Sequence, residues 1–348
     1  MSESTFVLQK YDGTMILQER IQIMCELGDY MHSTHPDWEA VQEQASRENT
    51  WFIKPFIKDA IRAITDQMLT SSKLKDWVSS YSIPENTRNP KKVGLVMAGN
   101  IPLVGFFDCL CIFISGHTAI IKPSSSDSRL IKHLIEWLLN RDSRISQYFQ
   151  LAERLQGCDA YIATGSNQSG RYFDYYFGKY PHIIRKNRTS VAVLNGQEGP
   201  ETLRLLTRDM LQYFGLGCRN ITQIWVPEGY SFEPMLEALK SYDFLMDLPA
   251  YKHNYDYHLT LLIMSNRYYM TNGSVVLTEN PSPFSPVSQI HYQFYQPGKF
   301  PENELKNNPD IQCIVGRYGI EPGAAQHPGL HDYADGVDTM DFLTGLYD

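Results

Sequence analysis

A strand, a turn, a helix and a second strand follow one another between Val93 and Lys122, and this order constrains the fold of the 348-residue chain more than any other feature. Pro102 fits the first turn of the helix, and Gly116 can end it in the left-handed conformation that glycine tolerates. Two strands joined through such a helix run parallel. We therefore predict an α/β fold with a βαβ unit made of Val93–Ala98, Gly99–Pro102, Leu103–Ser115 and Thr118–Lys122.

Asn100 stands at the carboxyl end of the first predicted strand, beside the N-terminus of the helix. Open α/β sheets bind ligands at this edge. A side-chain amide there can donate a hydrogen bond to an oxyanion that develops during a reaction. The simpler alternative is that Asn100 only caps the helix.

Cys218 lies in the glycine-containing stretch Gly215–Asn220, between a predicted helix at Glu198–Phe214 and a predicted strand at Ile221–Val226. A thiol in such a loop is accessible to a carbonyl carbon, and thiols are strong nucleophiles. By itself this placement is weak evidence, because small buried cysteines are common. Cys218 is the candidate catalytic nucleophile.

Two further strand ends suggest a dinucleotide site. Lys122 ends the second predicted strand and is followed by Pro123-Ser124-Ser125; a lysine there can meet ribose hydroxyls or phosphate, or can simply be solvated. Thr164-Gly165-Ser166 ends another strand and opens a helix, so its backbone N–H groups are available to a pyrophosphate. This turn lacks the three spaced glycines of a full dinucleotide fingerprint.

Together, in this order, the motifs resemble the aldehyde dehydrogenase superfamily. Asn100-Ile101-Pro102 is similar to its Asn-Phe-Pro turn, and Lys122-Pro123-Ser124 to its Lys-Pro-Ser strand end. Thr164-Gly165-Ser166 is similar to its Thr-Gly-Ser cofactor turn. Cys218 is similar to its catalytic cysteine, and Pro283–Val287 to its Ile-Phe-Gly-Pro-Val segment. The resemblance covers about residues 90–330. Within the superfamily it is strongest to the fatty acyl-CoA reductases of the bioluminescence type, whose C-terminal segment is similar to Ala325–Gly336.

The resemblance implies a Rossmann-like cofactor domain and an α/β catalytic domain that carries the cysteine. It places a helical region at 1–88, the nicotinamide-dinucleotide domain at 89–190, the catalytic domain at 191–330 and a C-terminal tail at 331–348. Cys218 and Asn100 are then the catalytic residues, and Phe284 lies near the nicotinamide. A dimer or tetramer is also implied.

Departures from the superfamily pattern shape the predicted activity. Ile184 falls near the position of the glutamate that activates water, and Ser282 near the position of the glutamate that holds the nicotinamide ribose. Without that first glutamate, a cysteine thioester suits acyl transfer better than hydrolysis. The prediction is reduction of an acyl-CoA to an aldehyde. A conventional aldehyde dehydrogenase, a cysteine acyltransferase or thioesterase, and an inactive scaffold are the alternatives.

NADPH is the expected cofactor, with NADH possible. NAD-using relatives often carry a glutamate three residues after the strand-end lysine, where this chain has Ser125. A neutral hydroxyl removes the repulsion that a carboxylate would exert on a 2′-phosphate.

The net charge of −8 at pH 7 argues against a nucleic-acid partner, which would require a basic face. Phosphates of an acyl-CoA partner would need a local basic patch. Arg185, Lys186 and Arg188 form one candidate, with a solvated loop cluster as the alternative.

The six cysteines have neither zinc-site spacing nor the pattern of a secreted framework, so we expect no metal and a cytoplasmic location. The first residues lack the order of a signal peptide. The apolar stretch Ile101–Ile121 is interrupted by Asp108, Gly105 and Gly116, which argues against a membrane span.

Three regions give weaker signals. Residues 1–88 contain amphipathic stretches that either cover the cofactor domain or form an acyl channel. The alternation of Tyr251, His253, Tyr255 and Tyr257 favours one face of a strand over a metal site. His327 and His331 are candidates for a general acid.

Overall fold

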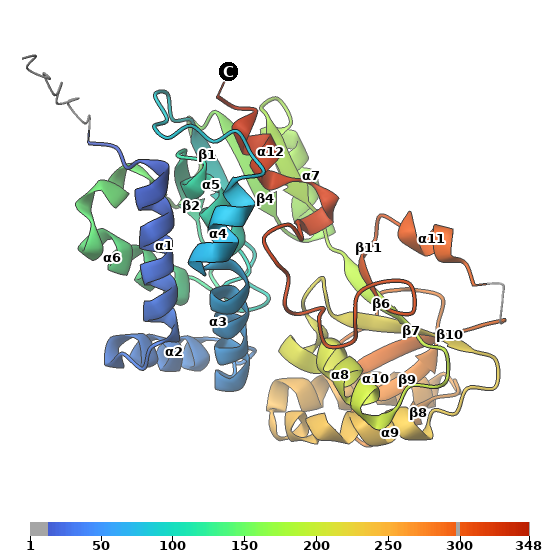
Figure 1. Cartoon of the computed structure of the whole chain (residues 1–348). Coiled ribbons are helices and arrows are strands. Elements are labelled where there is room, and N and C mark those ends of the chain that lie inside the picture. Colours follow the sequence, from blue (N-terminus) through green and yellow to red (C-terminus); the bar gives the residue numbers. More distant parts are fainter. Residues whose placement is uncertain (1–12, 297–299, 348) are drawn as a thin grey trace, which may run out of the picture.

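The computed structural model describes residues 13–296 and 300–347, which form two separate sheets with helices packed against them (Figure 1). The first sheet has five strands and the second has six in this part of the chain. The predicted α/β class is confirmed.

The first sheet is parallel, with strand order β3-β2-β1-β4-β5. Its central strands are almost completely buried, because helices lie between the strands in the chain and cover the sheet. The strands are β1 (Lys92–Val96), β2 (Thr118–Lys122), β3 (Phe149–Leu151), β4 (Ala160–Thr164) and β5 (His182–Arg185), and the helices α5 (Phe106–Ile114), α6 (Arg129–Arg141) and α7 (Asn167–Phe177).

The second sheet has the order β11-β6-β7-β10-β9-β8 and is parallel except for the antiparallel pair β8–β9. Its strands are β6 (Thr189–Val193), β7 (Ile221–Pro227), β8 (Met270–Thr271), β9 (Val276–Glu279), β10 (Gln289–Tyr295) and β11 (Ile311–Gly316). The helices of this region are α8 (Pro200–Leu211), α9 (Glu233–Leu239), α10 (Pro249–Met264) and α11 (Glu302–Lys306).

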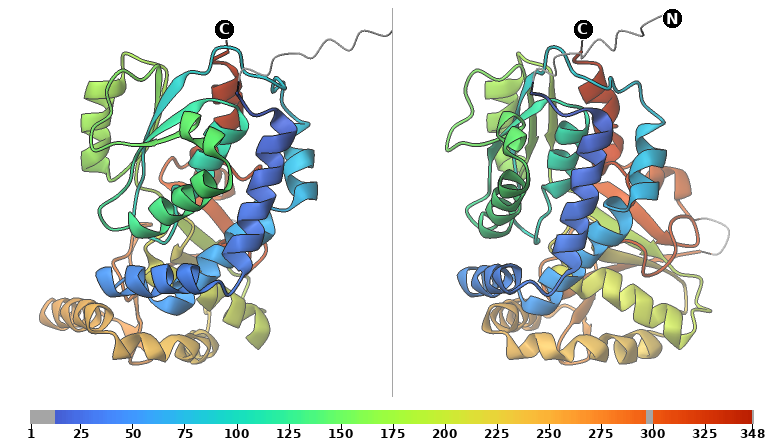
Figure 2. Two further views of the ribbon diagram at one scale, coloured as in Figure 1. Left: turned by 90° about the vertical axis from the view of Figure 1, so that its left-hand side faces the viewer. Right: turned by 60° about the vertical axis from the view of Figure 1, so that its left-hand side comes forward.

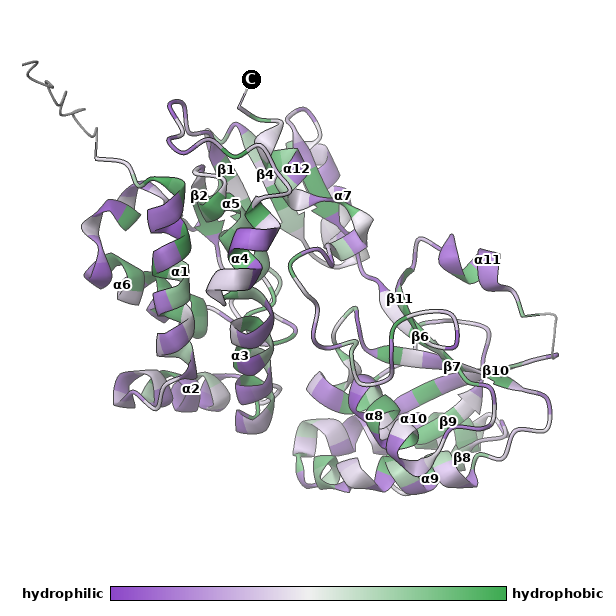
Figure 3. Cartoon of the chain, viewed as in Figure 1, coloured by the Kyte–Doolittle hydropathy of each residue, from purple (hydrophilic) through white to green (hydrophobic). Residues whose placement is uncertain are grey.

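Four helices precede the first sheet: α1 (Leu17–His32), α2 (Pro36–Glu48), α3 (Lys54–Met68) and α4 (Ser71–Val78). Hydrophobic and hydrophilic residues alternate along α1 and α3, as in amphipathic helices (Figure 3). Helix α1 packs against α5 and α6, so this group of helices lies beside the first sheet (Figures 1 and 2).

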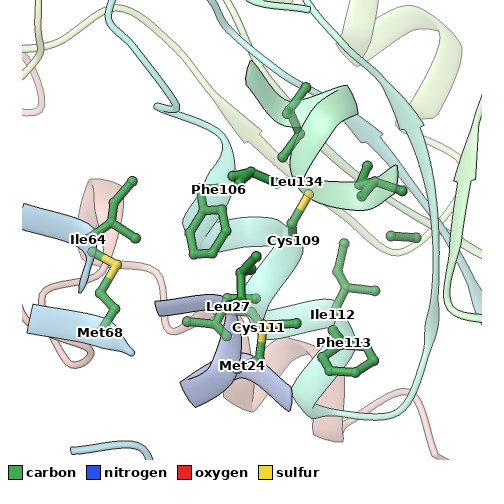
Figure 4. Close-up of a cluster of buried hydrophobic side chains, with 14 of the residues drawn as sticks. Met24, Leu27, Ile64, Met68, Phe106, Cys109, Cys111, Ile112, Phe113 and Leu134 are labelled. Atoms are coloured by element: carbon green, nitrogen blue, oxygen red, sulfur yellow. The ribbon is translucent and has the colours of Figure 1, made fainter. Parts of the chain in front are cut away.

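The first hydrophobic core gathers side chains from α1, α3, α5 and α6. Figure 4 shows Met24 and Leu27 of α1, Ile64 and Met68 of α3, and residues of α5 in one cluster. Cys109 and Cys111 of α5 are buried within this cluster. A second core lies under the second sheet, and α3 reaches it through Phe56 and Ala60.

The C-terminal segment returns from the second sheet to the first. The helix α12 (Thr339–Thr344) contacts α5, and the backbone carbonyl of Leu343 lies 2.9 Å from Nε2 of His117. Tyr333 Oη accepts a hydrogen bond of 2.9 Å from Trp77 Nε1. The segment therefore connects the second sheet to the helices around the first sheet.

Two local predictions are wrong in part. Helix α5 begins at Phe106 rather than Leu103, because Leu103 has a φ of 56° and its N–H is bound by Asp127. Asn100 is thus several residues too early to cap the helix. The predicted C-terminal glycine is confirmed, since Gly116 has a φ of 80°.

The predicted strand around Tyr251–Tyr257 is also wrong, because these residues belong to the helix α10. Tyr251, Tyr255 and Leu262 are its buried residues. The spacing of the two tyrosines is four, which is as compatible with a helix face as with a strand face. Across the described residues, no helix is both long enough and apolar enough to cross a membrane.

Candidate active site

A cavity of about 1050 Å³ lies where the two sheets meet. Its wall is formed by the end of β1 with the loop that follows it, one face of α3, the β2–α6 loop at Ser124 and Ser126, the β4–α7 turn, the link between the sheets, Gln312 of β11 and the C-terminal segment. The loop that carries Cys218 closes one side of it. The cavity thus brings together motifs more than one hundred residues apart in the chain.

The Cys218 loop is held in an unusual backbone conformation. Tyr213 and Phe214 have φ values of 54° and 60° and are buried. The buried Asn220 side chain accepts the Gly217 N–H at 2.8 Å and donates to the Gln212 carbonyl at 2.8 Å. Sequence reasoning missed Asn220, although an Asn directly before a strand is a common turn-fixing residue.

Cys218 is half-buried and lines the cavity. Burial raises its pKa, the Arg219 guanidinium acts to lower it, and the Asp335 carboxylate raises it further. Ser190 Oγ accepts the Cys313 N–H at 3.2 Å and donates to the Cys218 carbonyl at 3.0 Å. A thiol with a raised pKa needs a proton acceptor to become a nucleophile near pH 7.

Asn100 reaches the same loop. Its Nδ2 donates a hydrogen bond of 2.6 Å to the Leu216 carbonyl, two residues before Cys218. A side-chain amide has two N–H donors, so one is left for another acceptor. Asn100 and Cys218 both line the cavity.

The β4–α7 turn contributes Thr164, Gly165 and Ser166 to the cavity wall. Ser166 is the N-cap of α7, and its Oγ accepts the Ser169 N–H at 3.2 Å. A Cβ added at Gly165 would lie 2.9 Å from the Phe173 ring, so only glycine lets the turn pack this closely. The N-terminus of α7 therefore opens towards the cavity, as phosphate-binding helices do.

The comparison with known proteins rests on structure. No family model and no curated protein matches the sequence. An oxidoreductase from Marinobacter aquaeolei superposes with a TM-score of 0.65 at 12% identity, over 87% of this chain and 73% of that one. An NAD-dependent aldehyde dehydrogenase from Sinorhizobium meliloti superposes with a TM-score of 0.64 at 11% identity, over 86% of this chain and 70% of that one.

The chain has an aldehyde dehydrogenase-like fold. A Pseudomonas syringae aldehyde dehydrogenase variant crystallised with NAD+ and octanal is also similar, with a TM-score of 0.57 at 13% identity over 82% of this chain and 69% of that one. Identities this low establish the fold alone. The fold predicted from the five motifs is confirmed, and the acyl-CoA reductase branch stays a prediction.

In this aldehyde dehydrogenase-like fold the remaining cofactor candidates lie outside the cavity wall. Lys122 and Ser125 are exposed at and just beyond the carboxyl end of β2. Phe284 lies on the 280–288 loop, where the Ser282 carbonyl is 2.7 Å from His291 Nδ1. The residues present fit a dinucleotide at the β4–α7 turn, with Lys122 and Ser125 at the surface beside the end of β1.

The predicted basic patch is corrected at Arg185. This residue is buried, and its Nη1 lies 2.6 Å from Asp108 Oδ2. Its Nη2 donates to Thr339 Oγ1 of α12 at 2.8 Å. Arg185 is neither a free phosphate ligand nor a solvated loop residue, because its charge is already neutralised in the interior.

The other two cations of the patch are also paired. Lys186 Nζ lies 3.2 Å from Asp174, in a half-exposed pair, and Arg188 Nε lies 3.1 Å from Asp335. With a carboxylate on every cation, the stretch offers no surplus positive charge to the phosphates of a coenzyme. The candidate patch for acyl-CoA phosphates is therefore wrong as a free basic surface.

None of the described residues that line the cavity is a glutamate or a histidine. Ile184 is not part of the wall, and the neighbouring Arg185 is. His331 is exposed. The pKa of His327 is lowered by burial and by Arg208, and Asp59 acts in the opposite direction. Neither histidine is among the residues that line the cavity, and a role for either as general acid stays a prediction.

Two donors at the cavity wall find no hydrogen-bond partner within the described part of the chain. They are Nε2 of Gln326 and Nε of Arg185, both on buried side chains. Sequence reasoning missed Gln326, although it lies in the C-terminal motif that carried the branch resemblance.

Proposed function

We propose that the chain is a nicotinamide-dependent oxidoreductase of the aldehyde dehydrogenase type, and that it reduces an acyl-CoA thioester to the aldehyde. The single observation that carries the proposal is the composition of the cavity. It unites Cys218, Asn100 and the β4–α7 turn, while its described wall contains no glutamate or histidine to activate water. Of the aspartates on the wall, Asp108 and Asp335 are paired with arginines and Asp332 accepts the Gly329 N–H, so acyl transfer competes well with hydrolysis.

The proposed reaction begins at the Cys218 thiol. Its sulfur attacks the thioester carbonyl carbon, and the coenzyme thiol leaves. The free N–H of the Asn100 amide and the Cys218 backbone N–H stabilise the oxyanion. Because Asn100 is tied to the Cys218 loop through Leu216, the two groups keep a fixed spacing.

The cofactor, when bound, supplies the hydride that reduces the enzyme thioester. The residues proposed to hold it are Lys122, Ser125, the Thr164-Gly165-Ser166 turn and Phe284. Ser125 is exposed and uncharged beside Lys122, which supports a preference for NADPH over NADH.

The acyl chain is proposed to lie along α3. Ala60, Ala63, Ile64 and Met68 line the cavity from this helix, so a large part of the wall is apolar. Two alanines next to each other on one face leave space that larger residues would fill. This arrangement favours the acyl-channel role over a purely covering role for the N-terminal helices.

Aldehyde oxidation is the second candidate. It is favoured by the aspartates of the cavity wall, Asp108, Asp332 and Asp335, one of which could activate water in place of glutamate. Release of acid from an aldehyde with NAD+ or NADP+ would identify this activity.

Intact mass measurement after incubation with acyl-CoAs of several chain lengths tests the proposal. We expect one acyl group on the protein, which disappears with release of aldehyde on addition of NADPH and more slowly with NADH. Acylation that neither cofactor removes would indicate an acyltransferase or thioesterase. No adduct with any acyl-CoA would overturn the proposal.

Replacement of the nucleophile gives a matched comparison. Cys218→Ala should abolish covalent acylation and leave binding of NADPH within about twofold, because the variant keeps every residue proposed to hold the dinucleotide. Cys313→Ala, at the neighbouring cysteine, should still be acylated. Acylation that persists in Cys218→Ala and is lost in Cys313→Ala would move the nucleophile to Cys313.

A further inference from the structure

We infer that Arg219 forms an anion-binding site in the cavity, beside the Cys218 thiol, and that its ligand is a phosphate on the thiol carrier of the substrate. The inference rests on the proposed function, because it names the part of the acyl thioester that this residue recognises. Sequence reasoning did not single out Arg219, although it directly follows the candidate nucleophile.

Arg219 is placed at the nucleophile by the chain itself. The two residues are neighbours in sequence, and no peptide bond of the described chain is cis, so their Cα atoms lie about 3.8 Å apart. Both residues line the cavity, and both are half-buried. The guanidinium is therefore attached to the same short turn as the reacting sulfur.

The backbone on both sides of Arg219 is fixed. The Cys218 carbonyl accepts a hydrogen bond of 3.0 Å from Ser190 Oγ, and the Asn220 N–H donates to the Gly217 carbonyl at 3.0 Å. Ser190 and Asn220 are completely buried. The turn thus holds the backbone of Arg219 in place, while the Arg219 side chain takes no part in these bonds.

The Arg219 side chain has neither an ion pair nor a hydrogen bond to any described side chain or backbone group. In this respect it differs from the other described cations of the cavity wall, each of which is paired with a carboxylate. These pairs are Arg185 with Asp108, Lys186 with Asp174, and Arg188 with Asp335.

The aspartates of the wall do not compensate Arg219 either. Asp108 and Asp335 are already paired with other arginines. The third, Asp332, accepts the Gly329 N–H at 2.7 Å through Oδ2 and forms no ion pair with Arg219. The described wall therefore holds one guanidinium whose charge a bound anion can neutralise.

An arginine at this place selects a phosphate or carboxylate group. Its planar guanidinium presents N–H donors in a fork that matches two oxygens of such a group. The part of the wall that α3 supplies is apolar and suits an uncharged acyl chain. The charge of the substrate is then on its thiol carrier, where a phosphate follows the pantetheine arm. A carboxylate at the end of the acyl chain is the other source of the same chemistry.

Two alkylating reagents test the site without any substrate. Iodoacetate is an anion and iodoacetamide is neutral, and both attack the Cys218 thiolate, so the ratio of their rates does not depend on the pKa of the thiol. Arg219→Gln should lower the iodoacetate-to-iodoacetamide ratio about fivefold, because the attraction for the anion is lost. Arg219→Lys keeps the charge and should retain most of the ratio. Mass spectrometry of the Cys218 peptide measures both rates.

The matched control is Arg204→Gln, which removes a cation of α8 that is 59% exposed and paired with Glu201. This variant should leave the ratio unaltered. A substitution that only disturbs the loop would slow both reagents alike, so its ratio would stay at the wild-type value. An unaltered ratio in Arg219→Gln would therefore overturn the inference.

Thioesters of one acyl chain on three carriers identify the anion: CoA, phosphopantetheine, and pantetheine without phosphate. The second-order rate constant of Cys218 acylation is compared with that of the pantetheine thioester, which removes any effect on the thiol itself. In Arg219→Gln this relative rate constant should fall about 30-fold for both phosphorylated carriers. In Arg204→Gln it should change less than about twofold.

A pantetheine thioester whose acyl chain ends in a carboxylate tests the other source of the anion. A loss in Arg219→Gln that is confined to this substrate would keep the anion-binding site and place the anion on the acyl chain. Equal changes with charged and neutral substrates would refute the site.

Failure of the proposed function has a different signature. If the wild type forms no adduct with any thioester but Arg219→Gln lowers the alkylation ratio, the anion-binding site is supported and the acyl thioester is the wrong substrate. If thioesters acylate Cys218 but the alkylation ratio is the same in Arg219→Gln, the proposed function stands and the inference is wrong.

Discussion

At the scale of single residues, the most consequential arrangement outside the thiol is the buried pair of Arg185 and Asp108. It joins the end of β5 to α5, and Arg185 also binds Thr339 of α12. Three elements, of which β5 and α5 contribute to the cavity wall, are thus fixed to one guanidinium. Since both charges are out of water, loss of one leaves the other uncompensated.

Asp108→Ala should lower the free energy of unfolding by about 3 to 5 kcal/mol, measured by urea denaturation. The matched control is Asp174→Ala, which removes the half-exposed partner of Lys186 and should cost under about 1 kcal/mol. Equal losses in the two variants would mean that the interior does not hold Arg185 as a charged group.

At the scale of elements, the helix α3 both joins the two hydrophobic cores and lines the cavity. Ile57, Ile61 and Ile64 lie in the first core, whereas Phe56 and Ala60 lie in the second. Ala60, Ala63, Ile64 and Met68 also face the cavity. One amphipathic helix therefore bridges the two cores and supplies an apolar wall of the candidate site.

For the proposed acyl-CoA substrate, Ala63→Phe should shorten the acyl chain that the candidate site accepts. The added ring occupies space at the wall, so rates with long-chain acyl-CoAs should fall about 10- to 100-fold while short chains change about twofold, given roughly 0.8 kcal/mol per buried methylene. Steady-state rates across chain lengths measure this. Arg62→Phe, on the exposed face of α3, should leave the profile unaltered.

At the scale of the whole molecule, the C-terminal segment closes the structure. It passes the cavity at Gln326 and Asp335 and ends in α12 against α5. His117 anchors this end: its Nδ1 accepts the Lys91 N–H at 3.2 Å, so Nε2 carries the proton and donates to the Leu343 carbonyl. The dimer or tetramer implied by the family resemblance stays a prediction.

The His117 contact predicts a pH dependence of stability. Burial lowers the pKa of His117, so the unfolded chain binds its proton more strongly than the folded chain does. The free energy of unfolding should therefore fall as the pH decreases below about 6.5, by at most about 1.4 kcal/mol per pH unit from this group.

Urea unfolding of wild type and His117→Gln between pH 7.5 and 5.5 isolates this contribution from that of the carboxylates. At pH 7.5 the free energy of unfolding should be larger for the wild type than for His117→Gln. This difference between the two proteins should become smaller as the pH falls. A constant difference for His117→Gln would show that this group does not titrate between the two states.

The sequence by itself determined the features that depend on neighbouring residues. The βαβ unit, the left-handed Gly116 and the Thr164-Gly165-Ser166 turn follow from local spacing and glycine chemistry. The order of the motifs also predicted the aldehyde dehydrogenase-like fold. Local spacing failed at Tyr251–Tyr257, because tyrosines four positions apart share a face of either a strand or a helix.

Only the tertiary structure decided which charges are free. Arg185, Lys186 and Arg188 look like a basic patch in the chain, but their partners Asp108, Asp174 and Asp335 come from other elements. The hydrogen bond from Asn100 to Leu216 spans 116 positions, and no local pattern encodes it. Polar groups gain their partners through such long-range contacts, since burial without a partner is costly.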